Sequence, residues 1–314
     1  MKRLLKRALF GSAPMPAHVA VGFADARTEV RVVLDGLGSP IDVSGDHVPV
    51  ALRPFTLGLC LDASVTPSAL RRARLRLVLR DWVGGGSVRG RLALRVVARE
   101  PIALGARRLW LFEIAGSTNR CLPLVQLHAR ELHDWWGRRH GDPHNFRMTA
   151  SDLRAINVYY MRPRPVSLVT VIDGDASNIF PMDLIGPVSS GHFLLALRTT
   201  SPAVALMSHV RRVAVSAVPA AFKHAAYALG KHHRERSVDF GRLPFPTTAS
   251  PEFGLPVPAD ALVVRELAIR EVHTVGSHTL FVTEIERETS GLAGEALCHI
   301  ASPYAHIRRT PLLP

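Results

Sequence analysis

Short runs in which apolar and polar residues alternate, each closed by glycine or proline, leave this chain few folds to choose from. The clearest case is the run RRARLRLVLRDWV, which reaches Gly84-Gly85-Gly86 and is followed by SVRGRLALRVVARE. Alternation with a period of two is typical of a strand with one buried face, and two such runs around glycines predict a β-hairpin. One predicted face carries the arginines at 72, 74, 76 and 80, and the other carries the leucines at 75, 77 and 79.

The same signals fill residues 28–61, where the runs are separated by turn residues such as Asp35-Gly36 and Gly45-Asp46. A further strand, RRLWLFEIAG, ends near residue 116. We therefore predict a β-rich N-terminal domain over residues 21–119, whose role the sequence does not indicate. Its arginine face invites a nucleic-acid hypothesis, but no aromatic residues stand between the arginines to stack on bases. A solvated sheet face is favoured over a nucleic-acid surface.

Composition sets the broad class of protein. Hydrophobic residues make up 47% and charged residues 21%, the balance of a globular chain, and no apolar run is long enough to predict a membrane span. The net charge of +13 comes mostly from arginine and attracts nucleic acid, anionic lipid and phosphorylated cofactors alike. Cys60, Cys121 and Cys298 form no metal motif and no disulfide framework, so we expect core positions in a reducing cytoplasm.

Two segments lie outside the β-type pattern. Residues 1–20, beginning MKRLLKRALFGSAPMP, are basic and lack a clear cleavage site, so we predict a surface tail rather than a signal peptide. Residues 120–157 have helical spacing and are predicted as a helical linker, with Ser151-Asp152 as the N-cap of its second helix. The histidines of this linker match no zinc signature, so no metal site is predicted.

Residues 158–314 return to strand patterns, which makes the whole chain mainly β with short helices. Strands are expected at 166–172, at 193–198 and at 213–218, and a strand between the first two is expected to reach residues 182–185. Two more are expected in ALVVRELAIREVHTV and HTLFVTEIERETS. Their spacing suits a small antiparallel barrel. Between 219 and 261 prolines recur at 244, 246, 251, 256 and 258, so we predict a surface excursion without strands there.

The stretch RTTSPAVALM, residues 198–207, could bind an anion. An arginine leaves a strand, hydroxyl residues fill the turn, and Pro202 stands where a helix would begin. A guanidinium, hydroxyls and a helix N-terminus would then converge as they do around a phosphate. An ordinary helix cap explains the same residues equally well.

The stretch NIFPMDLIG, residues 178–186, suggests a strand with part of its backbone unpaired. Pro181 cannot donate to a sheet, so the strand must lie at an edge or contain a bulge. Free backbone amides beside an apolar wall suit an aromatic ring system with polar edges. A simple edge bulge is the alternative.

Four ordered segments of the C-terminal half are similar to one known family. RPVSLVTV, NIFPMDLIG, LLALRTTSPAVALM and GSHTLFVTEI resemble successive segments of the flavin reductase-like, FMN-binding split β-barrel domain. The resemblance covers about residues 158–304. It implies a C-terminal FMN-binding split barrel that follows the β-rich N-terminal domain and the helical linker, and a homodimer with FMN near the dimer interface.

The resemblance also implies roles for individual residues. Residues of the second segment would line the isoalloxazine: Asn178, Phe180, Pro181, Met182, Asp183 and Leu184. Residues of the third would hold the phosphate: Arg198, Thr199, Thr200 and Ser201. Lys223 and Lys231 lie in a region that often closes over the cofactor, and are a looser match.

His278, which heads the last of these segments, is the predicted catalytic residue. In family members that use NAD(P)H, the equivalent histidine faces flavin and nicotinamide, although a core or turn-capping histidine is the alternative. The implied function is an FMN-dependent oxidoreductase of the flavin reductase type, with NADH or NADPH as the donor and a partner oxygenase as one acceptor. The second hypothesis is an FMN-binding protein without reductase activity, in which the N-terminal β block binds a partner.

Overall fold

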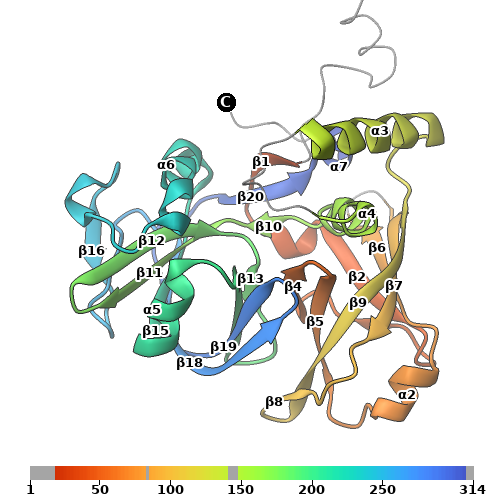
Figure 1. The fold of residues 1–314 in the computed structure, drawn as a ribbon, viewed down its shortest axis with the longest axis horizontal. Helices are drawn as coiled ribbons and strands as arrows, with labels where there is room; N and C mark the ends of the chain where they lie inside the picture. Colours follow the sequence, from red (N-terminus) through yellow and green to blue (C-terminus); the bar gives the residue numbers. More distant parts are fainter. Residues whose placement is uncertain (1–17, 83–84, 141–147, 309–314) are drawn as a thin grey trace, which may run out of the picture.

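The computed structural model describes residues 18–82, 85–140 and 148–308, and most of the predicted basic tail lies outside them. The N-terminal part forms one antiparallel sheet in the order β3-β2-β6-β7-β9-β5-β4, with β8 paired to β9 (Figure 1). Its strands are β2 (Val30–Asp35), β3 (Ile41–Asp42), β4 (His47–Leu52), β5 (Phe55–Asp62), β6 (Arg76–Asp81), β7 (Val88–Val96), β8 (Ile102–Leu104) and β9 (Arg107–Asn119).

The predicted hairpin is confirmed, because β6 and β7 pair antiparallel on either side of the glycines. Leu77 and Leu79 are fully buried on its inner face. The prediction was wrong for Arg72, which ends the helix α2 (Pro67–Arg72), and for Arg74, which precedes β6. Thr66 caps this helix by accepting a hydrogen bond from the Ala69 N–H, and proline at the first position favours a helix start.

A second sheet of seven strands, in the order β12-β11-β15-β18-β19-β14-β13, curls into a half-barrel in the C-terminal half. Its strands are β11 (Ser167–Asp173), β12 (Ala176–Met182), β13 (Ile185–Pro187), β14 (His192–Arg198), β15 (Arg212–Ala217), β18 (Val263–Val275) and β19 (His278–Ser290). The helix α5 (Pro202–Val210) follows β14. The strands predicted for this half are confirmed within a residue or two at their ends, except that the strand expected to reach 185 ends at Met182, and Ile185 begins the separate strand β13.

A third sheet joins the two ends of the chain. It places β20 (Ala296–Ala301) between β1 (His18–Phe23) and β10 (Arg164–Pro165), so residues 18–20 of the predicted tail belong to a strand (Figure 1). The helix α7 (Ser302–Arg308) follows directly, and the helix η1 (Ala26–Thr28) follows β1. The sequence analysis predicted neither β20 nor α7.

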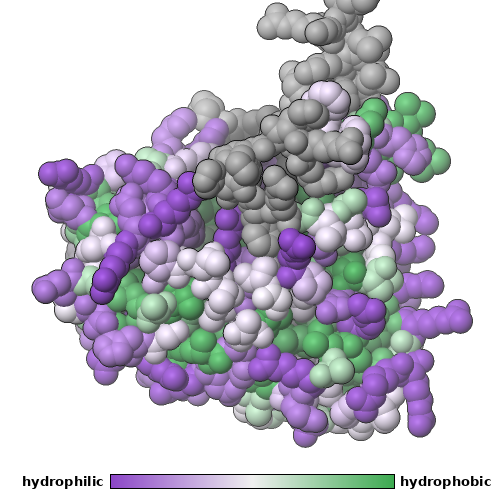
Figure 2. Space-filling view, viewed as in Figure 1, coloured by the Kyte–Doolittle hydropathy of each residue, from purple (hydrophilic) through white to green (hydrophobic). Residues whose placement is uncertain are grey.

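Two helices connect the halves: α3 (Leu124–His140) and α4 (Ala150–Tyr159). The cap of α4 is Thr149 rather than the predicted Ser151-Asp152, because the Thr149 hydroxyl accepts the Asp152 N–H at 3.1 Å. Large exposed apolar side chains gather on α3, at the upper right of Figure 2: Leu124, Val125, Leu132, Trp135 and Trp136. Within the described ranges, no helix combines the length and apolarity needed to cross a membrane.

The excursion between β15 and β18 is ordered, and the prediction that it lacks strands was wrong. It contains a small strand pair, β16 (Thr247–Ala249) with β17 (Pro256–Pro258). Proline is tolerated there because each strand of an isolated pair has an unpaired edge. The rest is helical: η2 (Ala220–Phe222), α6 (Lys223–Ala228), η3 (Leu229–Arg234) and η4 (Phe240–Arg242).

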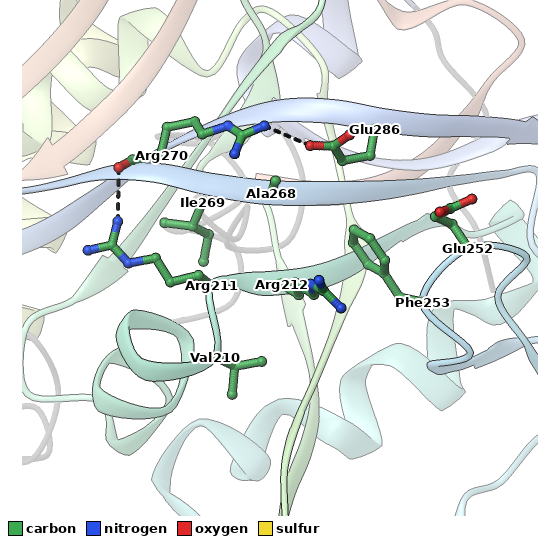
Figure 3. Close-up of a pocket in the computed structure, with 9 residues that line it drawn as sticks. All are labelled: Val210, Arg211, Arg212, Glu252, Phe253, Ala268, Ile269, Arg270 and Glu286. Carbon is green, nitrogen blue, oxygen red and sulfur yellow. Dashed lines mark hydrogen bonds and ion pairs between the residues drawn. The ribbon is translucent and has the colours of Figure 1, made fainter.

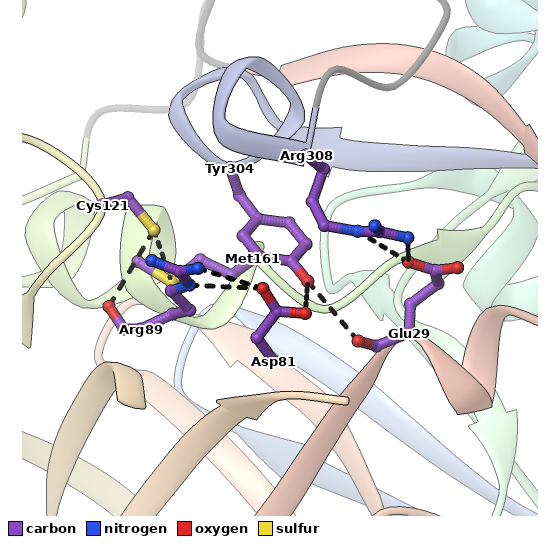
Figure 4. Close-up of polar contacts among 7 residues, drawn as sticks. All are labelled: Glu29, Asp81, Arg89, Cys121, Met161, Tyr304 and Arg308. Atoms are coloured by element: carbon purple, nitrogen blue, oxygen red, sulfur yellow. Dashed lines mark hydrogen bonds and ion pairs between the residues drawn. The ribbon is translucent and has the colours of Figure 1, made fainter. Parts of the chain in front are cut away.

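The two halves share their cores. One apolar cluster joins Phe112 of the N-terminal sheet to Tyr159 and to Tyr304 of α7, and a second joins Leu109 to Leu280. Polar contacts lie beside the first cluster (Figure 4). The Tyr304 hydroxyl lies 3.3 Å from Asp81 Oδ1, and Arg308 forms an ion pair with Glu29 at 2.6 Å. The three cysteines are free and buried, as predicted.

Candidate flavin site

The end of β14 and the start of β19 lie side by side. Arg198 and His278 are Cα partners in the sheet, and the Thr199 N–H donates to the Ser277 carbonyl at 3.2 Å. The Thr279 hydroxyl donates to Thr199 Oγ1 at 3.3 Å. The predicted phosphate segment and the predicted catalytic histidine are therefore neighbours in the sheet.

The first residues of α5 extend this site. Ser201 is the N-cap of α5, but its hydroxyl donates to the His233 carbonyl at 3.2 Å instead of capping the helix. Pro202 at the first turn has no N–H. The remaining N–H groups and the helix dipole give this end of α5 a partial positive charge.

Two arginines and two histidines surround the helix start. Partial burial, followed by the charge of Arg234, lowers the pKa of Arg198, although the residue as a whole is exposed to solvent. Burial also lowers the pKa of His233 and lowers that of His278 to about 4, and the Arg198 guanidinium adds to both shifts. Both histidines are therefore neutral near pH 7, and the positive charge belongs to Arg198 and Arg234.

His278 is held in a fixed orientation. Its side chain is only 3% exposed, and its Nδ1 lies 2.9 Å from Ser277 Oγ. Ser277 Oγ also accepts the Arg53 N–H at 3.1 Å, so the single hydroxyl proton can be donated to Nδ1. With that donation, the imidazole is the tautomer that carries its proton on Nε2.

The strand β12 is an edge strand, as Pro181 predicted, and the helix η3 covers its unpaired edge. His232 Nδ1 donates to the Ile179 carbonyl and His233 Nε2 donates to the Pro181 carbonyl, both at 2.8 Å. The Asn178 amide donates in return to the carbonyls of His232 at 3.1 Å and Glu235 at 2.8 Å. Through Ser201, η3 thus links β12 to the start of α5.

The other predicted ring-contacting residues occupy different surroundings. Phe180 and Met182 are buried in the apolar core of the half-barrel. Asp183 forms an ion pair with Arg164 at 2.5 Å and accepts from His299 Nδ1 at 2.7 Å. The Leu184 carbonyl accepts the Ala196 N–H. Their contact with a cofactor stays a prediction.

The remaining predicted residues lie on the surface or near it. Thr200 is exposed in the turn before α5. Lys231 is exposed on η3, beside the two histidines in sequence, and Lys223 is half-buried at the start of α6.

Sequence reasoning missed His232, His233 and Arg234. The signal was present in the run KHHRER, residues 231–236, but it was treated as part of a proline-rich excursion. The partners of these residues lie about fifty positions earlier in the chain, so no local pattern indicates them.

The donor set suits a phosphate group. Two guanidinium groups, the hydroxyls of Thr199 and Thr200 and a helix N-terminus suit a phosphate, which prefers charged and backbone N–H donors. Three or more His, Cys, Asp or Glu side chains that could together hold a metal ion are not found anywhere in the part of the chain that the structure describes.

Comparison with protein families decides the class of this half. Residues 160–308 match the family model of the flavin reductase like domain. The C-terminal half is a flavin reductase like domain. No curated protein sequence matches the chain.

Solved structures of similar shape include three bacterial proteins. An FMN-binding protein from Thermus thermophilus is 25% identical, with 46% of this chain and 86% of that chain covered and a TM-score of 0.41. The NADH:FAD oxidoreductase SgcE6 of Streptomyces globisporus is 22% identical, with coverages of 51% and 94% and a TM-score of 0.44. BorF, the flavin reductase component of a bacterial two-component tryptophan halogenase, is 20% identical, with coverages of 45% and 88% and a TM-score of 0.41.

Proposed function

We propose that the flavin reductase like domain binds FMN, with the phosphate at Arg198, Thr199, Thr200 and Ser201 and the ring beside β12. The position of Arg198 supports this proposal, because Arg198 directly precedes the turn into α5 and lies near enough to Arg234 for the two charges to interact. The link from η3 to both β12 and Ser201 would keep the phosphate and ring segments at a fixed separation.

The proposed activity is reduction of flavin by NADH or NADPH. Bound FMN would supply the hydride-accepting centre. Neutral His278 would orient the nicotinamide through a hydrogen bond from Nε2–H without adding a charge, since its pKa is lowered to about 4. Ser277 would keep the ring in that orientation.

The assembly and its setting follow from the same proposal. We expect a homodimer, with a partner oxygenase as one acceptor of reduced flavin. The likeness to BorF, described as a reductase component of a two-component halogenase, agrees with such a partner. Three buried free thiols agree with a reducing cytoplasm.

A second candidate is an FMN-binding protein without reductase activity, in which the N-terminal sheet binds a partner. The burial of His278 favours it, because a side chain that is 3% exposed reaches a nicotinamide only after its surroundings move.

Anaerobic mixing of the FMN-loaded full chain with NADH or NADPH separates the two candidates. Loss of oxidised-flavin absorbance is expected for the reductase, and His278→Ala should slow it about tenfold or more while FMN stays bound. His224→Ala, an exposed histidine of α6, is the matched control. Absence of bleaching with either nicotinamide would support the second candidate, and absence of bound FMN would exclude both.

A further inference from the structure

A cavity of about 670 Å³ lies at the opposite end of α5 from Arg198 (Figure 3). Val210, Ala268 and Ile269 contribute its apolar lining. Its volume is within the range of about 300–1,000 Å³ that small-molecule sites have. Since α5 has nine residues, about 13 Å of helix separates the cavity from the proposed phosphate site.

Arg211 enters this cavity from an unfavourable backbone conformation. It has φ 59° and ψ 17° in the left-handed region at the end of α5, where glycine is the preferred residue. Its N–H closes the helix on the Met207 carbonyl, and its guanidinium donates to the Arg270 carbonyl at 2.9 Å. Arg211 thus occupies a position whose backbone conformation favours glycine.

Arg212, the next residue, faces an aromatic wall. Its guanidinium carbon lies 5.4 Å from the centre of the Phe253 ring. The Cα partner of Arg212 in β18 is Ala268, which has a small side chain and also lines the cavity. Figure 3 shows the Arg212 side chain next to the Phe253 ring.

The wall that carries Phe253 is held in place by a buried carboxylate. Glu266 is 1% exposed and accepts hydrogen bonds from the Ser250 hydroxyl and from the N–H groups of Glu252 and Phe253. These bonds fix the turn before β17, so the ring does not have to be ordered when a ligand binds.

The charges around the cavity favour a ligand with one negative charge. The lining holds three arginines and two glutamates, which gives a net charge of +1. Arg270 forms ion pairs with Glu284 at 2.7 Å and Glu286 at 2.8 Å, and Glu252 pairs with Arg287 at 4.0 Å. Arg211 and Arg212 are the remaining cations, and the Phe253 ring and apolar lining beside them favour a carboxylate attached to an aromatic ring over inorganic phosphate.

We propose that this cavity binds a small aromatic carboxylate, with the carboxylate on Arg211 and Arg212 and the ring against Phe253. The site is separate from the proposed flavin site and does not depend on the flavin chemistry.

Titration of the full chain with 2-naphthoate, followed by the fluorescence of the ligand, tests the proposal. Saturable binding is expected, and Arg211→Gly and Arg212→Gln should each weaken it about tenfold, as expected for loss of a charge-assisted hydrogen bond. Arg211→Gly should also keep or raise the Tm, because glycine suits the left-handed position. Weaker binding in that variant therefore cannot come from unfolding.

Matched controls complete the experiment. Arg242→Gln changes an exposed arginine outside the cavity and should leave binding unchanged. Uncharged 2-naphthalenemethanol, inorganic phosphate and FMN should neither bind there nor displace 2-naphthoate. The proposal would be overturned by wild-type affinity in both arginine variants, by absence of saturable binding at millimolar ligand, by preference for phosphate, or by competition with FMN.

Discussion

His278 makes the stability of the protein depend on pH. Its pKa is about 4 in the folded chain and about 6.5 in the unfolded chain, so only the unfolded chain takes up the proton between these values. The contribution of neutral His278 to the free energy of unfolding is therefore complete above pH 6.5 and is lost as the pH falls toward 4.

We predict that His278→Gln reduces the fall in unfolding free energy between pH 7 and pH 5 by about 2 kcal/mol. Urea unfolding at both values measures it, and an equal fall in both proteins would contradict the assignment.

Asp183 is predicted to stabilise the fold through its ion pair with Arg164. The Arg164 charge and the His299 hydrogen bond outweigh burial and hold the pKa of Asp183 below its ordinary value, so the pair contributes stability that is lost only in acid. Asp183→Asn should lower the unfolding free energy by about 3–5 kcal/mol, because Arg164 is 3% exposed and would lose its carboxylate. Asp173→Asn, at the more exposed pair with His209, is the control. Similar losses in both variants would show that burial of the pair does not matter.

At the scale of elements, η3 is predicted to position both cofactor segments. His233→Ala removes the hydrogen bond to the Pro181 carbonyl and the ring contact with Phe180 at 5.1 Å. FMN affinity should fall about two- to tenfold, the effect of one hydrogen bond. Isothermal titration with FMN measures it, with His224→Ala of α6 as the control. An unchanged affinity would mean that η3 only covers the edge of β12.

Elements with a strong local pattern were predictable from the sequence. The leucine alternation of β6 and the Asp173-Gly174 turn between β11 and β12 each depend on neighbouring residues, and both are confirmed. Arg72 was misplaced because the alternation in RRARLRL overlaps the end of a helix, whose signals were the Thr66 cap and Pro67 at its first position. β20 is short and gains its stability from pairing with β1, almost 280 positions away, which no local pattern reveals.

The candidate site was predictable only in part. Arg198 and His278 were predicted separately, each from its place at a strand end, and the structure brings them together as Cα partners. The participation of His233 and Arg234 depends on how the excursion folds back onto β12, which is set by tertiary contacts. For the same reason the sequence did not show that Asp183 is already bound to Arg164 and His299.

At the scale of the whole molecule, shared cores predict that the halves unfold together. All four tryptophans lie before residue 137, so their fluorescence reports the N-terminal part, whereas bound FMN reports the C-terminal part. We expect both signals to change in one thermal transition, because Tyr304 and Leu280 pack in cores that contain N-terminal residues. Two separated transitions would show that the halves fold independently. The predicted domain boundaries at residues 20, 119 and 157 stay predictions until this measurement is made.

FMN affinity of the full chain and of Arg198→Ala, measured by quenching of flavin fluorescence, tests the central claim most directly. We predict saturable binding to the natural chain, a loss of about tenfold or more in Arg198→Ala, and no change in the exposed control Arg242→Ala. Equal affinity in all three proteins, or no binding to the natural chain, would contradict a flavin phosphate site at the start of α5.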